Sequence, residues 1–401
     1  MRQTPPAPFK SAKPHSLSIA VLVDTASGWG RRLIRGVTAY ADRHAGWRLW
    51  FEPLGRSEAV HLPHDWDGDG VIVRIGSLKL AEKLHDLKKP VVNVSAIDIK
   101  PYSFTRVTND NLESARLAAE HFIERGFRNF AYVGPLHHEY VRAHAEAFAQ
   151  ETADRRTFYD SFDYLHESMT RRSWLARRES LGNWLESLPK PVGLFSWATT
   201  AAVQVLDVCR IRNIDSPSRI AVLAGDDDDL LCEATKPRLS AVVTASEQVG
   251  FHAAELLHQL ILNPQAPVRE VKVKPLHIKT RQSTDVLAVP DEDLAAALAI
   301  IHNEFSRPIT VQEVADRVAV SRRTLERGFQ EFFGRTPLEE IRRLRLERAR
   351  QLLIDTDLPI SRVAVLSGFG TPEYLSVKFT AEYGKTPLRY RKGIRNSSGG
   401  K

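Results

Sequence analysis

The chain has 401 residues, of which 43% are hydrophobic and 26% are charged. This is the composition of an ordinary globular protein with room for two or three domains. Its two cysteines, Cys209 and Cys232, are too few for a disulfide framework and favour a reducing compartment. No apolar run reaches the roughly 18 residues needed to span a bilayer, so no membrane contact is expected.

The N-terminal stretch is polar and proline-rich, with no apolar segment typical of a signal peptide. We therefore expect residues 1–16 to be a disordered leader on a cytoplasmic protein. The net charge of +7 is confined to the other end of the chain, because residues 321–395 contain 16 Lys and Arg against 9 Asp and Glu. A basic segment favours contact with nucleic acid, and a solvated arginine-rich helical surface is the alternative.

After the leader, short apolar runs alternate with longer amphipathic stretches. Runs that are apolar on both faces are typical of buried parallel strands. They are Leu17–Val23, Gly70–Ile75, Pro90–Ala96, Phe130–Gly134, Val192–Ala198, Arg219–Gly225 and Leu239–Ala245. Between them, "NLESARLAAEHFIERG" predicts a helix that ends before Gly126, with an apolar face of Leu112, Ala115, Ala119, Phe122 and Ile123. The alternation predicts a doubly wound α/β architecture with parallel sheets, long enough for two lobes.

Open α/β sheets bind ligands at the carboxyl ends of their strands, where this chain has several polar and aromatic residues. Carboxylates and guanidinium groups can bind sugar hydroxyls, and an aromatic ring can stack on the sugar. We therefore expect a monosaccharide site formed by Asp24, Trp29, Arg31, Arg74, Asp110, Arg142 and Asp226. Alternatively, each strand-end aspartate caps the helix that follows it.

The stretches "SIAVLVDTASGWGRRLIRGVTAYA", "DNLESARLAAEHFIERGFRNFAYVG" and "AVLAGDDDDLL" make residues 17–283 similar to the LacI-type, periplasmic-binding-protein-like effector domain. This resemblance implies a two-lobed sugar-sensing domain. Where that family often has a ligand-binding Asp or Asn after the strand Val192–Ala198, this chain has "TTAA", with Thr199 as the nearest polar candidate.

Near the C-terminus one phrase occurs twice, as "FQEFFGRTPL" in Phe329–Leu338 and as "FTAEYGKTPL" in Phe379–Leu388. Each copy ends a longer pattern of about 30 residues. Two copies are too few for a solenoid, which needs three or more repeats. They predict two copies of a small helical unit.

Local signals identify the unit as a helix-turn-helix. Thr310 and Glu313 predict a capping box that opens a helix over residues 311–318. Ser321 predicts the cap of a second helix, which ends at Gly334. A short helix, a tight turn and another helix form the motif whose second helix enters the major groove of DNA.

The exposed faces of the two second helices are the expected DNA-contacting surfaces. In the first unit, Leu325 and Phe329 face the core, and in the second unit Thr371 and Pro372 predict the helix start. The outward-facing candidates are Arg322, Arg323, Glu326, Arg327, Glu373, Ser376 and Lys378. An arginine can read guanine, and Glu326 can either accept from cytosine or pair with a neighbouring arginine.

Between the two units, "EEIRRLRLERARQLLIDTD" has an apolar stripe and a face of five arginines. It predicts a rigid spacer helix whose arginines, such as Arg345, at most touch phosphate, and a solvated linker helix is the alternative. With "RLRLERARQLL" and "GKTPLRYRK", residues 291–395 resemble the AraC/XylS-type DNA-binding domain. We expect residues 284–290 to be a linker and residues 396–401 a disordered tail.

An AraC-type domain behind a LacI-type effector domain resembles the xylose operon regulators of the XylR type. The resemblance implies a cytoplasmic, sugar-responsive activator of D-xylose or related pentose catabolism. Its expected partners are a double-stranded DNA operator, a monosaccharide, RNA polymerase and a second copy of the chain. Neither a cofactor nor a metal is expected, because the histidine-rich stretches lack metal-ligand spacing. A sugar-acting enzyme or a sugar-binding protein with a basic helical tail is the alternative.

Overall fold

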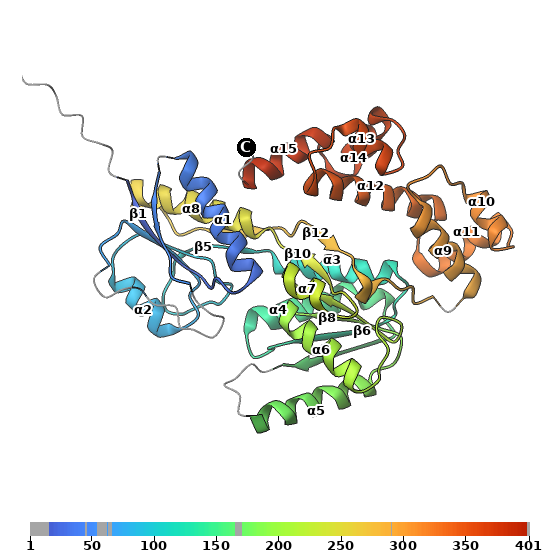
Figure 1. Ribbon diagram of the computed structural model, residues 1–401, viewed down its shortest axis with the longest axis horizontal. Coiled ribbons are helices and arrows are strands. Elements are labelled where there is room, and N and C mark those ends of the chain that lie inside the picture. Colours follow the sequence, from blue (N-terminus) through green and yellow to red (C-terminus); the bar gives the residue numbers. More distant parts are fainter. Residues whose placement is uncertain are drawn as a thin grey trace, which may run out of the picture.

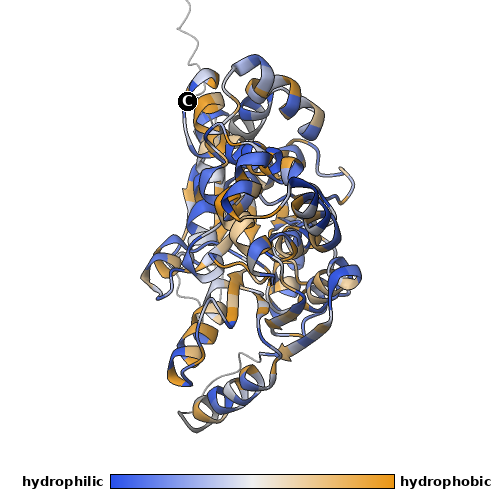
Figure 2. Ribbon diagram, turned by 90° about the vertical axis from the view of Figure 1, so that its right-hand side faces the viewer, coloured by the Kyte–Doolittle hydropathy of each residue, from blue (hydrophilic) through white to orange (hydrophobic). Residues whose placement is uncertain are grey.

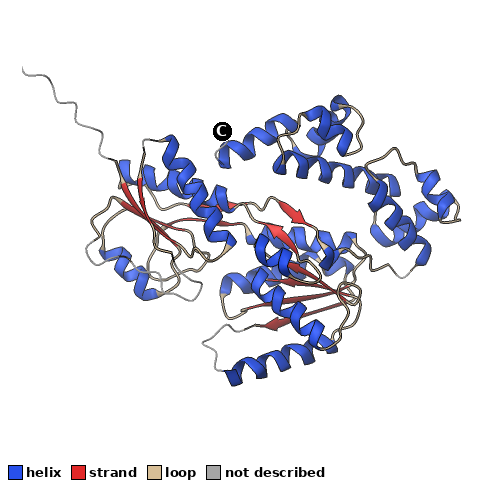
Figure 3. Ribbon diagram, viewed as in Figure 1, coloured by secondary structure: helices blue, strands red, loops and turns tan. Residues whose placement is uncertain are grey.

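The computed structural model describes residues 16–44, 46–53, 62, 66–164, 171–289 and 291–398. It contains two α/β lobes followed by a helical domain (Figure 1; Figure 3). Except for Ser16, the predicted leader lies outside the described residues. None of the described helices has the length and apolar character needed to cross a lipid bilayer.

The first lobe, here called the N-lobe, is built on a parallel sheet with the strand order β11-β5-β4-β3-β1-β2. Its strands are β1 (Ser18–Leu22), β2 (Arg48–Trp50), β3 (Gly70–Val73), β4 (Val91–Asn93), β5 (Thr105–Asn109) and β11 (Glu270–Val273). Its helices are α1 (Gly28–Arg43), α2 (Leu78–Asp86) and α8 (Ser246–Leu262). Gly36 allows α1 to approach α8 closely. A Cβ at this position would lie only 1.9 Å from the Glu247 carbonyl oxygen.

The second lobe, the C-lobe, has the strand order β12-β10-β9-β8-β6-β7. Its strands are β6 (Asn129–Gly134), β7 (Phe158–Asp163), β8 (Val192–Ser196), β9 (Ile220–Ala224), β10 (Ser240–Val243) and β12 (His277–Lys279). Its helices are α3 (Asn111–Glu124), α4 (Glu139–Glu151), α5 (Arg171–Ser187), α6 (Thr199–Ile211) and α7 (Asp229–Ala234), with 3₁₀ turns at Ala153–Arg155 and Gln282–Thr284. The predicted parallel sheets are confirmed, and the edge strand β12 is the one exception among the described strands, since it runs antiparallel to β10.

The chain passes between the lobes three times, after β5, after β10 and between β11 and β12. We call these three crossings, residues 109–111, 243–246 and 273–277, the hinge. The predicted helix after the first crossing is α3, and Gly126 follows it with φ +85°. Ala115, Ala119 and Phe122 are buried as predicted, but Leu112, in the first turn of α3, is 52% exposed.

The C-terminal domain is all helical, with two small cores. Its helices are α9 (Glu292–Glu304), α10 (Val311–Arg317), α11 (Arg322–Phe333), α12 (Pro337–Asp355), α13 (Ile360–Leu366), α14 (Pro372–Tyr383) and α15 (Pro387–Ser398). Helix α12 contributes Ile341 to the first core and Leu346 to the second, so it joins the two helix-turn-helix units rigidly. Helix α15 extends three residues into the predicted tail; residues 399–401 lie outside the described part.

The helix caps follow the sequence signals with one exception. Ser321 accepts from the Thr324 amide at 3.0 Å, and Gly334 ends α11 with φ +72°. Thr310 caps α10, but the Glu313 side chain pairs with Arg307 and does not return to the cap. The predicted capping box is therefore wrong at α10.

In Figure 2 the helices carry hydrophilic and hydrophobic residues side by side, as expected for helices that bury one face.

Candidate functional site: an inter-lobe cavity and two helix-turn-helix units

A cavity of about 810 Å³ lies between the lobes, and most of its wall follows the carboxyl ends of strands from both sheets. From the N-lobe and the hinge come Asp24, Ser27, Trp29, Arg74, Val94, Ser95, Ala96, Thr108, Asn109 and Thr244. From the C-lobe come Asn111, Ser114, Pro135, Tyr140, His144, Tyr164, Trp197, Ala198, Thr200, Ala201, Gly225 and Asp226. The cavity therefore lies where ligands of open α/β sheets bind.

Four of the expected ligand residues line this cavity: Asp24, Trp29, Arg74 and Asp226. An Arg74 nitrogen lies 4.0 Å from an Asp24 carboxylate oxygen, and the guanidinium group lies 5.7 Å from the centre of the Trp29 ring. Asp24 also accepts from the Ser27 amide at 2.9 Å, which fixes the loop that leads into α1. The N-lobe thus presents one aromatic ring, one carboxylate and one guanidinium group to the cavity.

The structure does not bring the other four to the cavity wall. Arg31 is exposed and donates to the carbonyl oxygens of Thr25 and Ala26, so it braces the loop before α1. Arg142 is exposed on α4 and points away from the helix face that reaches the cavity. Asp110 accepts from the Glu113 amide at 3.1 Å and caps α3, which is the alternative role considered for it.

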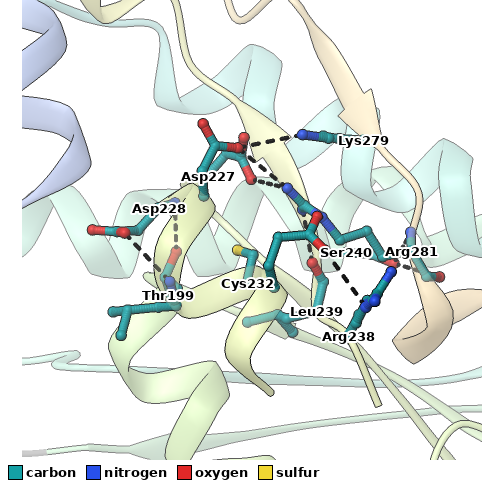
Figure 4. A network of polar contacts seen from close by, with 12 residues as sticks. Thr199, Asp227, Asp228, Cys232, Arg238, Leu239, Ser240, Lys279 and Arg281 are labelled. Atoms are coloured by element: carbon teal, nitrogen blue, oxygen red, sulfur yellow. Dashed lines mark hydrogen bonds and ion pairs between the residues drawn. The ribbon is translucent and has the colours of Figure 1, made fainter. Parts of the chain in front are cut away.

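Thr199 is fully buried beneath the cavity, and its hydroxyl donates to the Asp226 carboxylate at 2.9 Å. It therefore positions Asp226, and the next residue, Thr200, lines the cavity instead. The three aspartates that follow Asp226 are all engaged in polar contacts, and Figure 4 shows those of Asp227 and Asp228. Asp227 pairs with the buried Arg281 at 2.9 Å, while Asp229 lies 3.3 Å from Lys279.

Asp228 links the two lobes. Its carboxylate accepts from the Gly28 amide at the start of α1 at 2.9 Å, although the two residues are 200 positions apart. It also caps α7 by accepting from the Leu231 amide. A carboxylate at a helix N-terminus is favoured by the helix dipole, so this contact stabilises the relative position of the lobes in the structure.

Several cavity residues were not predicted from the sequence, namely Tyr140, His144, Trp197, Asn109 and Asn111. Trp197 follows β8 directly, so its position after a strand was an available signal. The rings of Tyr140 and Trp197 lie 5.1 Å apart at 68°, and form an aromatic wall on the C-lobe side. With Trp29 on the N-lobe side, the cavity has aromatic rings from both lobes.

The expected DNA-contacting residues lie on α11 and α14. Arg322, Arg323 and Arg327 are exposed on α11. Arg322 pairs with Glu326 at 2.8 Å, which is the second of the two roles considered for Glu326. On α14, Glu373 is exposed, Ser376 is half-buried, and the Lys378 ammonium lies 5.7 Å from the Tyr374 ring. The first unit therefore presents more free positive charge than the second.

The arginine face of α12 is largely directed into the protein. Arg345 donates to the carbonyl oxygens of Phe305, at 2.7 Å, and Arg307, at 2.8 Å, which satisfies the C-terminal end of α9. The guanidinium group of Arg345 is therefore engaged within the protein, and a phosphate contact by Arg345 stays a prediction. Arg348 is exposed on the same helix and remains free to meet solvent or a polyanion.

Two further arginines of α12 join the helical domain to the effector lobes. Arg343 pairs with Glu124 of α3 at 2.7 Å and with Glu340 of its own helix at 2.9 Å. Glu340 is fully buried and also pairs with Arg335 and with His302. Burial alone would raise the pKa of Glu340, but its cationic neighbours, Arg343 first among them, hold that pKa well below its ordinary value.

Arg350 reaches the hinge itself, because its guanidinium group donates to the Leu276 carbonyl oxygen in the third crossing. Next to it, His277 lies 4.0 Å from Asp355 at the end of α12. At the other end of the helical domain, α15 packs against α8 of the N-lobe, as Figure 1 also shows. The helical domain therefore contacts both lobes and the hinge between them.

Comparison with known proteins assigns the two parts of the chain. A family described as a periplasmic binding protein-like domain matches residues 119–284, and one described as a helix-turn-helix domain matches residues 314–393. The xylose operon regulatory protein of Escherichia coli K12 is 29% identical over 380 residues, which cover 93% of this chain and 96% of that protein. The xylose operon regulatory protein of Haemophilus influenzae is 24% identical, over 93% and 97% of the two chains.

A solved structure described as the xylose-binding transcription activator XylR matches with a TM-score of 0.60 and 27% sequence identity. The match covers 95% of this chain and 99% of that one. The chain is thus a DNA-binding transcription regulator with a sugar-responsive effector domain of the periplasmic-binding-protein type. Along nearly its whole length it is similar to the xylose operon regulatory proteins. A merely basic helical tail does not account for the helix-turn-helix match.

Proposed function

We propose that this regulator binds a pentose, D-xylose in the first place, in the inter-lobe cavity and activates transcription of genes for its catabolism. The observation that carries the proposal is the cavity wall, which combines aromatic rings from both lobes with Asp24, Arg74 and Asp226. Sugars present apolar ring faces and polar edges, and this wall offers partners for both. The similarity to xylose operon regulatory proteins supports D-xylose among the pentoses.

A larger sugar is the second candidate ligand, because a cavity of about 810 Å³ exceeds the space that one pentose fills. Calorimetric titration of the full chain with pentoses, hexoses and their disaccharides tests both candidates. The proposal predicts saturable binding of D-xylose with one site per chain. Tighter binding of a disaccharide than of any pentose would replace the proposed ligand, and no binding of any sugar would refute the proposal.

The contacts of the helical domain provide a route from the sugar to the DNA. Closure of the lobes around a sugar rotates them about the hinge, and α12 is bonded to that hinge at Leu276 and to the C-lobe at Glu124. Helix α15 rests on the N-lobe. Rotation must therefore change at least one of these contacts and shift the position of α11 and α14.

The finer parts of the proposal concern partners and location. Homodimer formation and a contact with RNA polymerase are supported by the resemblance to AraC-type activators alone. Light scattering of the full chain tests the dimer. Because transcription regulators act on chromosomal DNA, the proposal locates the protein in the bacterial cytoplasm.

A further inference from the structure

Two buried polar atoms in the cavity wall have no hydrogen-bond partner among the described residues. They are Nε2 of His144, on α4 of the C-lobe, and Oδ1 of Asn109, at the end of β5 in the N-lobe. The His144 side chain is only 2% exposed. A buried polar atom without a partner costs free energy, and proteins retain few of them. Both atoms therefore indicate a ligand that pairs with them.

The other ring nitrogen of His144 defines which kind of partner Nε2 needs. The Tyr132 hydroxyl lies 2.9 Å from Nδ1, and Tyr132 is fully buried. Burial raises the pKa of Tyr132 well above its ordinary value, so the hydroxyl keeps its proton. If Nδ1 carried the proton, the tyrosine hydrogen would have no acceptor among the residues that the structure describes. The satisfied arrangement has the tyrosine O–H donating to Nδ1, which leaves Nε2–H as a donor.

Three aromatic rings hold the imidazole in this orientation. The ring of Trp197, which also lines the cavity, lies 5.3 Å from the His144 ring at 82°. Phe195 and Tyr132 lie 4.9 Å and 5.6 Å from it. Such edge-to-face contacts restrict rotation of the imidazole. The donor is therefore preorganised before a ligand arrives, which lowers the entropic cost of binding.

We propose that His144 is a sugar-binding residue, whose Nε2–H donates to a hydroxyl oxygen of the bound monosaccharide while Oδ1 of Asn109 accepts from a hydroxyl of the same molecule. This inference rests on the proposed function, since it requires a sugar in the cavity. A polyol suits the pair because a hydroxyl group both donates and accepts. An ionised carboxylate would satisfy His144 but could not donate to Asn109.

The charge state of His144 matches this role. Burial lowers the pKa of His144 to about 3, so the imidazole is neutral throughout the physiological range. A neutral donor recognises an uncharged hydroxyl without leaving a buried charge. Sugar affinity is therefore expected to be independent of the protonation of His144 between about pH 5 and pH 8.

The test is calorimetric titration of the full chain with D-xylose and with each monodeoxy-D-xylose. The variants are His144→Phe, which removes the donor but keeps a ring, and His144→Gln, which keeps an N–H. His137→Phe is the matched control, because His137 is exposed and does not line the cavity. We expect His144→Phe to weaken D-xylose binding about ten-fold or more, His144→Gln to lose less, and His137→Phe to bind like the wild type.

The deoxy sugars separate a contact from a structural role. At the hydroxyl bound by His144, removing the oxygen weakens binding to the wild type but not further to His144→Phe. Equal additional losses at every position, or wild-type affinity in His144→Phe, would overturn the inference while the proposed function stands. If the wild type binds none of these sugars, the proposed function falls and this inference falls with it.

Discussion

At the scale of single residues, the cavity distinguishes two arginines that the sequence made equivalent. Arg74 lines the cavity beside Trp29 and Asp24, whereas Arg31 braces the loop before α1 from outside. Replacing Arg74 by Met removes a donor to the ligand and should cost roughly 1–3 kcal/mol of sugar affinity. Arg31→Met is the matched control and should leave the affinity unchanged. Calorimetry decides, and an equal loss in both variants would contradict the assignment of the site.

The recognition helix allows a second comparison between single residues. Arg323 and Arg327 are exposed on α11. Arg327 lies 3.9 Å from Glu331, whereas Arg322 is paired more closely with Glu326. We expect Arg323→Ala and Arg327→Ala to relax the base preference of the regulator at particular positions, by roughly 1–3 kcal/mol each. Arg348→Ala, on α12, should weaken binding to every sequence alike or not at all. Equal losses of Arg323→Ala on operator and scrambled DNA would refute base reading.

The buried histidines give the stability of the protein a pH dependence. His144 has a folded-state pKa of about 3, lowered by burial, against roughly 6.5 in the unfolded chain. Between these values the unfolded chain binds the proton, so stability is full above about pH 6.5 and falls as the pH decreases. From pH 7 to pH 5 His144 alone should cost about 2 kcal/mol of unfolding free energy. Urea unfolding of the wild type and of His144→Phe at several pH values measures the contribution of His144. If the unfolding free energies of the two proteins changed with pH in parallel, this contribution would be contradicted.

At the scale of elements, α12 is more than the spacer that its sequence predicts. Its apolar stripe is recognisable from the periodicity, but its arginines bond to α9, α3 and the hinge through tertiary contacts that no local pattern records. Arg345→Ala leaves two carbonyl groups without their donor and should lower the stability of the helical domain by roughly 1–3 kcal/mol. Arg348→Ala is again the control. Thermal unfolding of the two variants measures the change. If Arg345→Ala left the stability unchanged and lowered the salt slope of DNA binding, Arg345 would contact phosphate and the structural role would be contradicted.

The ion pair between α3 and α12 supplies a prediction about communication. Glu124→Gln removes the charge that Arg343 meets on the C-lobe but leaves the pairs of Glu340 with Arg343 and Arg335 in place. We expect this variant to bind sugar and DNA, with a smaller effect of sugar on DNA affinity. Arg343→Met should instead destabilise the protein by about 3 kcal/mol or more, because Glu124 loses its ion-pair partner and the buried Glu340 loses one of its two arginines. A sugar response in Glu124→Gln equal to that of the wild type would exclude this contact from the coupling.

The strands that the sequence did not predict have a common physical cause. Four of them, β2, β7, β11 and β12, are the edge strands of the two sheets. Edge strands are short and partly exposed, so they lack the continuous apolar run of the central strands. β5, "TRVTN", lies next to an edge and has Val107 as its one apolar residue, so it shows no apolar run either. The seven apolar runs that were predicted all correspond to central or near-central strands, and they sufficed to define the fold class.

The candidate site was predictable only in part, for a similar reason. Asp24, Arg74 and Asp226 follow strands directly, so the rule for α/β sheets finds them. His144 lies on the second turn of α4 and Asn109 within β5, and only the three-dimensional arrangement brings them to the cavity. Arg31 and Asp110 show the converse, because a position near a strand end also suits a loop brace or a helix cap.

At the scale of the whole molecule, the central claim is that a sugar between two lobes controls a DNA-binding domain that touches both. The contacts at Glu124, at Leu276 and between α15 and α8 are formed together in this structure. Sugar binding and DNA binding should therefore be thermodynamically linked, so that each changes the affinity for the other by the same factor.

The most direct test uses the full chain and a pool of random DNA, from which bound sequences are selected with and without D-xylose. The affinity for the selected sequence and for its scrambled counterpart is then measured at several salt concentrations, with and without the sugar. We expect a defined operator whose affinity changes about five-fold or more on addition of D-xylose, with little change for scrambled DNA. A selected operator that binds equally well with and without every sugar that occupies the cavity would contradict the account.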